Sequence, residues 1–137
     1  MQKRFNRDIQ ALDAVFAFIG EYLKNSNIND AVSYAVNVAV EEIFTNCVKY
    51  NTKSKEDIAL DINHEGNKLI ITITDNDSEF FDITKTDEVD TDMPLEKRQP
   101  GGLGIHLVKQ MMDEVKYQYN DGVSIITLVK NLENNDV

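Results

Sequence analysis

Two amphipathic helices are predicted in the first fifty residues, where apolar side chains recur at steps of three and four. The first helix runs from Asn6, which can cap it, to about Lys24, with apolar positions at Ile9, Leu12, Val15, Phe16, Ile19 and Leu23. The second runs from about Asp30 to Tyr50 and buries a stripe made of Val36, Val40, Ile43 and Cys47. Cys47 is therefore expected to act as a small buried hydrophobe.

Alternating apolar and polar residues then predict two β-hairpins. The first is formed by Asp57–Asn63 and Lys68–Thr74, with a tight turn at His64–Asn67. The second is formed by Val115–Tyr119 and Val123–Val129 near the end of the chain. Strands joined by such short turns are expected to pair antiparallel.

A long polar segment separates the two hairpins. Residues Asp82–Pro100 span about 19 positions, more than most connections inside a compact domain, and this predicts a lid or a disordered segment. A third helix follows at about Leu103–Asp113, and Lys3–Phe5 is a candidate short strand. The pattern predicts one domain, residues 1–137: a two-layer α/β sandwich whose helices cover one face of a mixed, mostly antiparallel sheet.

Charge narrows the range of partners. The 14 basic and 24 acidic residues give a net charge of −10, which disfavours nucleic acid and anionic membrane surfaces. The chain has no apolar run of about 20 residues and its start, Met1–Asp8, has no apolar targeting core, so a cytoplasmic protein is expected. A nucleotide would need local positive potential from a metal ion, a helix N-terminus or basic side chains.

The second helix carries a polar stripe with candidate chemistry. Glu42 and Asn46 lie four residues apart, and Lys49 and Tyr50 follow one turn later. An amide oxygen such as that of Asn46 suits magnesium, and a carboxylate such as that of Glu42 can accept a proton from an attacking hydroxyl. The same spacing is common on solvated helix faces, so a plain surface stripe is the alternative.

Two further segments are candidates, and each has a simpler explanation. Asp75 ends an apolar strand, where its carboxylate can accept a hydrogen bond from an amine such as that of adenine; the alternative is an ordinary turn at Asp75–Ser78. Gly101–Gly104 precedes a helix whose first amides can face an anion; the alternative is a flexible joint. The glycine spacing matches neither a P-loop nor a dinucleotide-binding fingerprint.

Taken together, these motifs resemble those of the GHKL ATPases. Glu42–Tyr50 looks like the N box, Asp75–Phe80 like the G1 box and Gly101–Gly104 like the G2 box, in family order. Met93–Arg98 and Gly101–Val115 are similar to anti-sigma-factor serine kinases in particular. The resemblance spans about Asn6 to Leu132 and implies the Bergerat ATP-binding fold.

The resemblance also implies roles for individual residues. Asn46 would bind Mg²⁺, Glu42 would act as the base or orient the acceptor, and Asp75 would receive the adenine amine. Gly102 and Gly104 would let backbone amides approach the phosphates of ATP. The remaining members of the implied nucleotide site are Lys49, Tyr50, Asp77, Phe80, Arg98, Gly101, Leu103 and Thr127.

Four of these positions carry a specific expectation. Lys49 stands where sensor histidine kinases contact phosphates, Arg98 is a lid candidate for the γ-phosphate, and Thr127 would support the adenine site. Asp77 departs from the family pattern, because the G1 box usually has glycine there. Aspartate tolerates a left-handed backbone better than most residues, but its side chain can crowd the nucleotide.

The function implied is that of an ATP-dependent serine/threonine protein kinase. It would phosphorylate an anti-anti-sigma partner with a STAS domain, sequester a sigma factor and, by analogy, form a homodimer. A non-catalytic module in which ATP only gates protein binding is the alternative that Asp77 favours. A detached histidine-kinase catalytic domain is a third reading, suggested by Lys49 and Tyr50.

Overall fold

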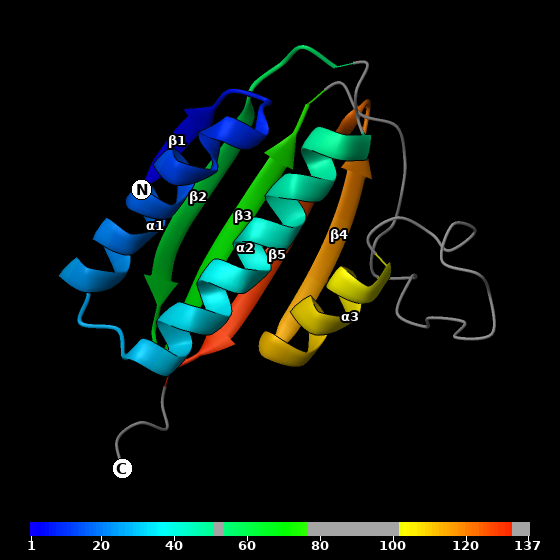
Figure 1. Ribbon diagram of the computed structural model, residues 1–137. Helices are drawn as coiled ribbons and strands as arrows, with labels where there is room; N and C mark the ends of the chain where they lie inside the picture. Colours follow the sequence, from blue (N-terminus) through cyan, green and yellow to red (C-terminus); the bar gives the residue numbers. More distant parts are fainter. Residues whose placement is uncertain (51–53, 77–101, 133–137) are drawn as a thin grey trace.

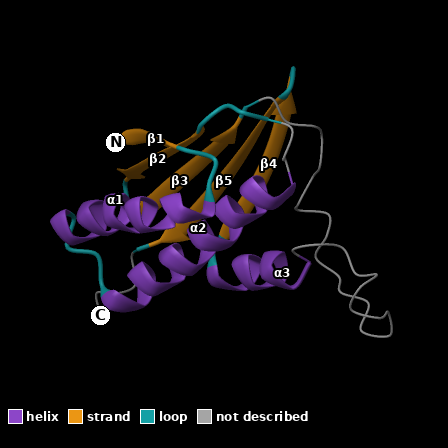
Figure 2. Ribbon diagram, turned by 45° about the horizontal axis from the view of Figure 1, so that its top comes forward, coloured by secondary structure: helices purple, strands orange, loops and turns teal. Residues whose placement is uncertain are grey.

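The protein folds into two layers, a β-sheet and a set of helices that cover one of its faces (Figures 1 and 2). A computed structural model describes residues 1–50, 54–76 and 102–132. In chain order the elements are β1 (Gln2–Phe5), the 3₁₀ turn η1 (Ile9–Ala11), α1 (Leu12–Asn25), α2 (Asp30–Tyr50), β2 (Ile58–Glu65), β3 (Lys68–Asp75), α3 (Gly102–Met111), β4 (Glu114–Asn120) and β5 (Val123–Asn131). The predicted two-layer α/β sandwich is confirmed.

The sheet has five strands in the order β1-β2-β3-β5-β4. The predicted, mostly antiparallel sheet is confirmed, and each pairing between the five described strands is antiparallel, with no parallel pair among them. The candidate strand at Lys3–Phe5 exists and pairs with β2 at one edge. The central strand, β3, lies between β2 and β5 and ends at Asp75.

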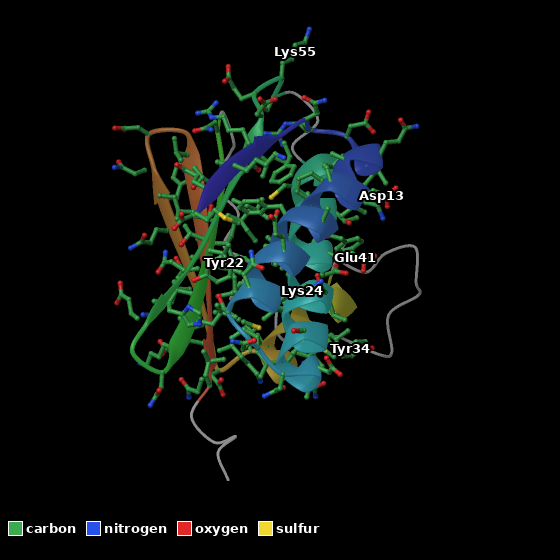
Figure 3. All side chains as sticks on the ribbon, turned by 90° about the vertical axis from the view of Figure 1, so that its left-hand side faces the viewer. Asp13, Tyr22, Lys24, Tyr34, Glu41 and Lys55 are labelled. Carbon is green, nitrogen blue, oxygen red and sulfur yellow. The ribbon has the colours of Figure 1, made fainter. Side chains whose placement is uncertain are left out.

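The core lies between the helices and one face of the sheet. In β3 the buried apolar residues are Leu69, Ile71 and Ile73. The predicted stripe of α2, formed by Val36, Val40, Ile43 and Cys47, is buried against the sheet. Tyr22 of α1 reaches towards the sheet, where its hydroxyl lies 2.9 Å from Nδ1 of His64 (Figure 3). None of the helices within the described ranges is long and apolar enough to cross a bilayer.

The start of the first helix differs from the prediction. Asn6 does not cap it; instead the side chain of Asp8 accepts the amide of Gln10 at 2.9 Å, which starts the short turn η1, and α1 begins only at Leu12. Aspartate accepts a backbone amide well from this position, so the local turn is preferred over an earlier helix. The link from β1 to η1 bends at Arg7, where the amide of Asp8 donates to the carbonyl of Asn6 at 2.8 Å, and it places Arg7 at the end of the sheet where β3 ends.

Both hairpins close with two-residue turns that need left-handed backbone. Gly66 has φ 62° in the first turn, and Asp121 and Gly122 have φ 50° and 82° in the second. Two successive positive φ values match the twist of an antiparallel pair, and Asp-Gly is a favoured sequence for such a turn. Because the turns are this short, the strands that precede them, β2 and β4, end later than predicted, at Glu65 and Asn120.

Two adjacent isoleucines of β3 provide a matched test of the layer arrangement. Ile71 is fully buried on the helix side, whereas Ile70 is partly exposed on the other face. We expect Ile71→Ala to lower the free energy of unfolding by about 2–5 kcal/mol because it leaves a cavity, and Ile70→Ala to cost clearly less. Urea denaturation measures both. Equal losses would show that the open face of the sheet is as well packed as the core.

Candidate functional site

The candidate site lies at the end of the sheet where β3 and α2 both terminate (Figure 1). Asp75, the last residue of β3, is buried, and its carboxylate accepts a hydrogen bond from the thiol of Cys47 on α2. Cys47 directly follows Asn46 in the helix. The structure therefore brings the end of β3 against the last turns of the helix that carries the predicted polar stripe.

Asp75 forms a buried ion pair with Arg7. Nη2 of Arg7 lies 2.5 Å from Oδ1 of Asp75, and each side chain is only 7% exposed. The guanidinium also donates to three backbone carbonyls: Nη1 to Cys47 at 3.1 Å, Nε to Glu56 at 3.2 Å and Nη2 to Asn76 at 3.4 Å. One side chain thus joins the start of the chain, the end of α2, the loop before β2 and the end of β3.

The polar stripe of α2 is a set of interacting side chains. Glu42 and Asn46 form a side-chain hydrogen bond. Partial burial raises the pKa of Glu42 and the neighbouring Glu41 adds to this, while Lys49 and the hydrogen bond from Asn46 act in the opposite direction. Glu41 itself is exposed on the helix layer (Figure 3).

The hydrogen bond between Glu42 and Asn46 determines the orientation of the Asn46 side-chain amide. An ionised carboxylate only accepts hydrogen bonds, so Asn46 donates its amide NH₂ group to Glu42. The amide oxygen is then the atom of Asn46 that can serve a hard cation. Glu42 in this way orients the group that the motif assigns to the metal.

Cys47 is a structural thiol, as the apolar pattern predicts. Burial raises its pKa well above the usual value, and the negative charge of Asp75 and its hydrogen bond to that carboxylate raise it further, against the opposing charge of Arg7. A thiol held protonated in this way is a poor nucleophile. Its contribution is the contact that it makes with Asp75.

On β5 the structure places a different residue beside Asp75 from the one expected. Ser124 is the cross-strand partner of Asp75, is buried, and its hydroxyl lies 2.9 Å from the hydroxyl of Tyr117. Thr127 pairs with Thr72 instead, and because its neighbours Ile126 and Leu128 face the core, Thr127 lies on the opposite face of the sheet. The alternation of β5 contained this signal, since residues 124, 126 and 128 share one face.

The remaining predicted residues fall into two groups. Gly102, Leu103 and Gly104 form the first turn of α3, which packs against α2, and Tyr50 is the last residue of α2. Asp77, Phe80, Arg98, Gly101 and the predicted lid at residues 82–100 lie outside the described residues. Within residues 1–50, 54–76 and 102–132, no three acidic, histidine or cysteine side chains cluster as a ready metal site.

These features define a class of protein. Residues 5–130 match the family described as the histidine kinase-like ATPase domain. The chain belongs to this family. The match covers the ion pair, the polar stripe of α2 and the start of α3, so all parts of the candidate site lie inside it.

More specific relatives are serine-protein kinases named RsbW. A relative from Listeria monocytogenes serovar 1/2a is 34% identical over 94 residues, covering 65% of this chain and 60% of the relative. The one from Bacillus velezensis is 30% identical over 93 residues, covering 64% and 58%. The chain therefore spans about three fifths of the length of these curated relatives.

Solved structures support the fold. The RsbU and RsbW domains of a Mycobacterium tuberculosis protein align with a TM-score of 0.70 at 16% identity, covering 96% of this chain and 32% of that one. A chain of the SiaB–SiaC complex from Pseudomonas aeruginosa aligns with a TM-score of 0.65 at 12% identity, covering 95% and 87%. At these identities the likeness concerns the arrangement of the elements alone.

The buried ion pair makes a prediction about stability. We expect Arg7→Met to lower the free energy of unfolding by about 3–5 kcal/mol, because it leaves the Asp75 carboxylate buried without its counter-charge. The double variant Arg7→Met/Asp75→Asn removes both charges and is expected to recover part of this loss. Urea denaturation measures the set.

Arg4→Met is the matched control, since Arg4 is an exposed arginine of β1. It is expected to change stability by no more than about 0.5 kcal/mol. An Arg7→Met protein as stable as Arg4→Met would contradict the structural importance of the pair.

Proposed function

We propose that this protein binds ATP at the end of β3 and α2 and transfers the γ-phosphoryl group to a serine or threonine of a partner protein. The observation that carries the proposal is the placement of Asp75. Its carboxylate is buried against the helix that carries the Glu42–Asn46 hydrogen bond. This supports a single site in which Asp75 would accept the base and the polar stripe of α2 would serve the phosphates.

The chemistry of each group suits its part in binding. The Asp75 carboxylate can accept the 6-amino group of adenine, and Ser124 lies beside it on β5. Mg²⁺ would be held by the Asn46 oxygen and the phosphates of ATP, and it would supply positive charge to the transferring group. The first amides of α3, at Gly102–Gly104, add the positive end of a helix. These local sources of positive charge would offset the effect of the net charge of −10 on a bound phosphate.

The transfer step needs a group that accepts one proton. The hydroxyl oxygen of the partner forms a bond to the γ-phosphorus while the bond from that phosphorus to the β,γ-bridging oxygen breaks, and ADP leaves with the electron pair. The hydroxyl proton passes to the carboxylate of Glu42. Burial raises the pKa of Glu42, which makes its carboxylate a better base than a solvated one.

The proposed partners follow from the relatives and the resemblance. The curated relatives are named serine-protein kinases. We propose an anti-anti-sigma protein with a STAS domain as the substrate and a sigma factor as a second partner, both in the cytoplasm, with a second copy of this chain completing a homodimer. A protein that binds ATP and leaves it intact, but changes its affinity for such a partner, is the second candidate, favoured by Asp77 in the usual glycine position of the G1 box.

Two adjacent glutamates of α2 allow a matched test of catalysis. With γ-labelled ATP, Mg²⁺ and a STAS-domain protein from the same genome, we expect Glu42→Gln to slow phosphoryl transfer by about 10²-fold or more, because the proton acceptor is lost. Glu41→Gln, at the exposed neighbouring position, is expected to stay within about threefold of the wild type.

Three results would count against this reaction. Equal rates for both variants would remove Glu42 from the mechanism. ATP binding without transfer by the wild type would favour the ATP-gated module. A phosphoprotein product that is lost in acid would indicate phosphohistidine in place of phosphoserine.

A further inference from the structure

Arg7 is held by more partners than an ion pair requires. Besides Asp75, its guanidinium donates to the backbone carbonyls of Cys47, Glu56 and Asn76, which belong to three separate segments. These carbonyls belong to the backbone of α2, of the loop before β2 and of the residue after β3, and the fold holds them in place. The guanidinium therefore has a fixed position and orientation before any ligand arrives.

The carboxylate of Asp75 is constrained in turn. It accepts one hydrogen bond from the guanidinium of Arg7, in the link between β1 and η1, and another from the thiol of Cys47 in α2. Both are hydrogen-bond donors, and both are buried. Together they limit rotation of the carboxylate about its side-chain bonds, which a carboxylate at the end of a strand would otherwise undergo.

We infer that Arg7 is a positioning residue, which holds the Asp75 carboxylate in the orientation that accepts the 6-amino group of the nucleotide base. The inference rests on the proposed function, in which Asp75 receives adenine. It adds that the choice of adenine depends on a side chain 68 positions earlier in the chain, on the link between β1 and η1.

The protein's preference between nucleotides with different bases tests this positioning role of Arg7. Adenine presents an N–H donor at position 6, whereas hypoxanthine, the base of inosine triphosphate (ITP), presents an oxygen acceptor. A carboxylate in the correct orientation bonds the first and repels the second. Sites built to hydrogen-bond one substrate group reject an analogue without it by large factors. The preference for ATP over ITP thus reports the orientation of Asp75.

Arginine suits this position better than lysine. Its planar fork has five donors in fixed geometry, and here it reaches a carboxylate and three carbonyls at once. A lysine would keep the positive charge near Asp75 but would lose most of these anchors. Arg7→Lys therefore separates the effect of charge from that of orientation.

Inhibition of nucleotide binding is the chemical alternative for the same contact. If the guanidinium competed with adenine for Asp75, the ion pair would inhibit binding, and its removal would raise the affinity for ATP. The carbonyl anchors favour positioning, because a competitor would have to break three further hydrogen bonds in order to leave.

The test is titration calorimetry of Mg²⁺–ATP and Mg²⁺–ITP against the wild type, Arg7→Met, Arg7→Lys and the control Arg4→Met. We expect the wild type and Arg4→Met to prefer ATP by about 100-fold or more. In Arg7→Met the preference should fall at least about tenfold, through weaker ATP binding with little change for ITP. Arg7→Lys should lie between these values.

The ratio of the two affinities separates positioning from folding. A variant that is only partly folded loses apparent affinity for both nucleotides by the same factor, so the ratio stays unchanged. Arg7→Lys retains the counter-charge of Asp75. If Arg7→Met does not fold, the affinity ratio is measured on Arg7→Lys in its place.

The other outcomes overturn the inference in distinguishable ways. An unchanged preference in both Arg7 variants, or tighter ATP binding, would overturn it and leave the proposed function standing. A wild type that binds ATP and ITP equally would also overturn it, because Asp75 would then not read the base. A wild type that binds neither nucleotide would overturn the proposed function as well.

Discussion

The buried ion pair between Arg7 and Asp75 is the interaction on which the site depends. Moving two charges out of water is costly, and such a pair is tolerated only when further hydrogen bonds satisfy its atoms. Here the guanidinium meets three backbone carbonyls and the carboxylate meets the thiol of Cys47. Because these partners come from three segments and Arg7 comes from a fourth, the pair fixes the end of β3 relative to the last turns of α2. Asp75 is thereby linked to the helix that also carries Glu42 and Asn46.

The rest of the fold makes this cluster rigid. β3 is the central strand, buried against the helices along Leu69, Ile71 and Ile73, so its last residue cannot shift without disturbing the core. α2 packs over the same face through an apolar stripe and presents Glu42 and Asn46 at its margin. A site made from the ends of packed elements is more precise than one carried by loops. Such rigidity suits the nucleotide site that we propose.

Local periodicity predicted the elements well and the long-range contacts poorly. The bounds of α2 and its buried stripe were predicted, as were both hairpins, because these depend on spacing within a segment. Arg7 was missed because no local pattern indicates a partner 68 residues away. Thr127 was expected near adenine from the resemblance, whereas strand register places Ser124 beside Asp75. The sheet was expected to be mixed but mostly antiparallel, and the pairing between β3 and β5, which are far apart in the sequence, is antiparallel as well.

The central claim is that Asp75 receives the base of ATP while Asn46 serves the metal ion. A crystal structure with Mg²⁺ and a non-hydrolysable ATP analogue tests it most directly. We expect the 6-amino nitrogen to lie about 2.7–3.2 Å from the Asp75 carboxylate, Arg7 to keep its contact with that carboxylate, and the Asn46 oxygen to lie about 2.1 Å from Mg²⁺. An analogue bound elsewhere, or bound with Asp75 out of reach of the base, would contradict it.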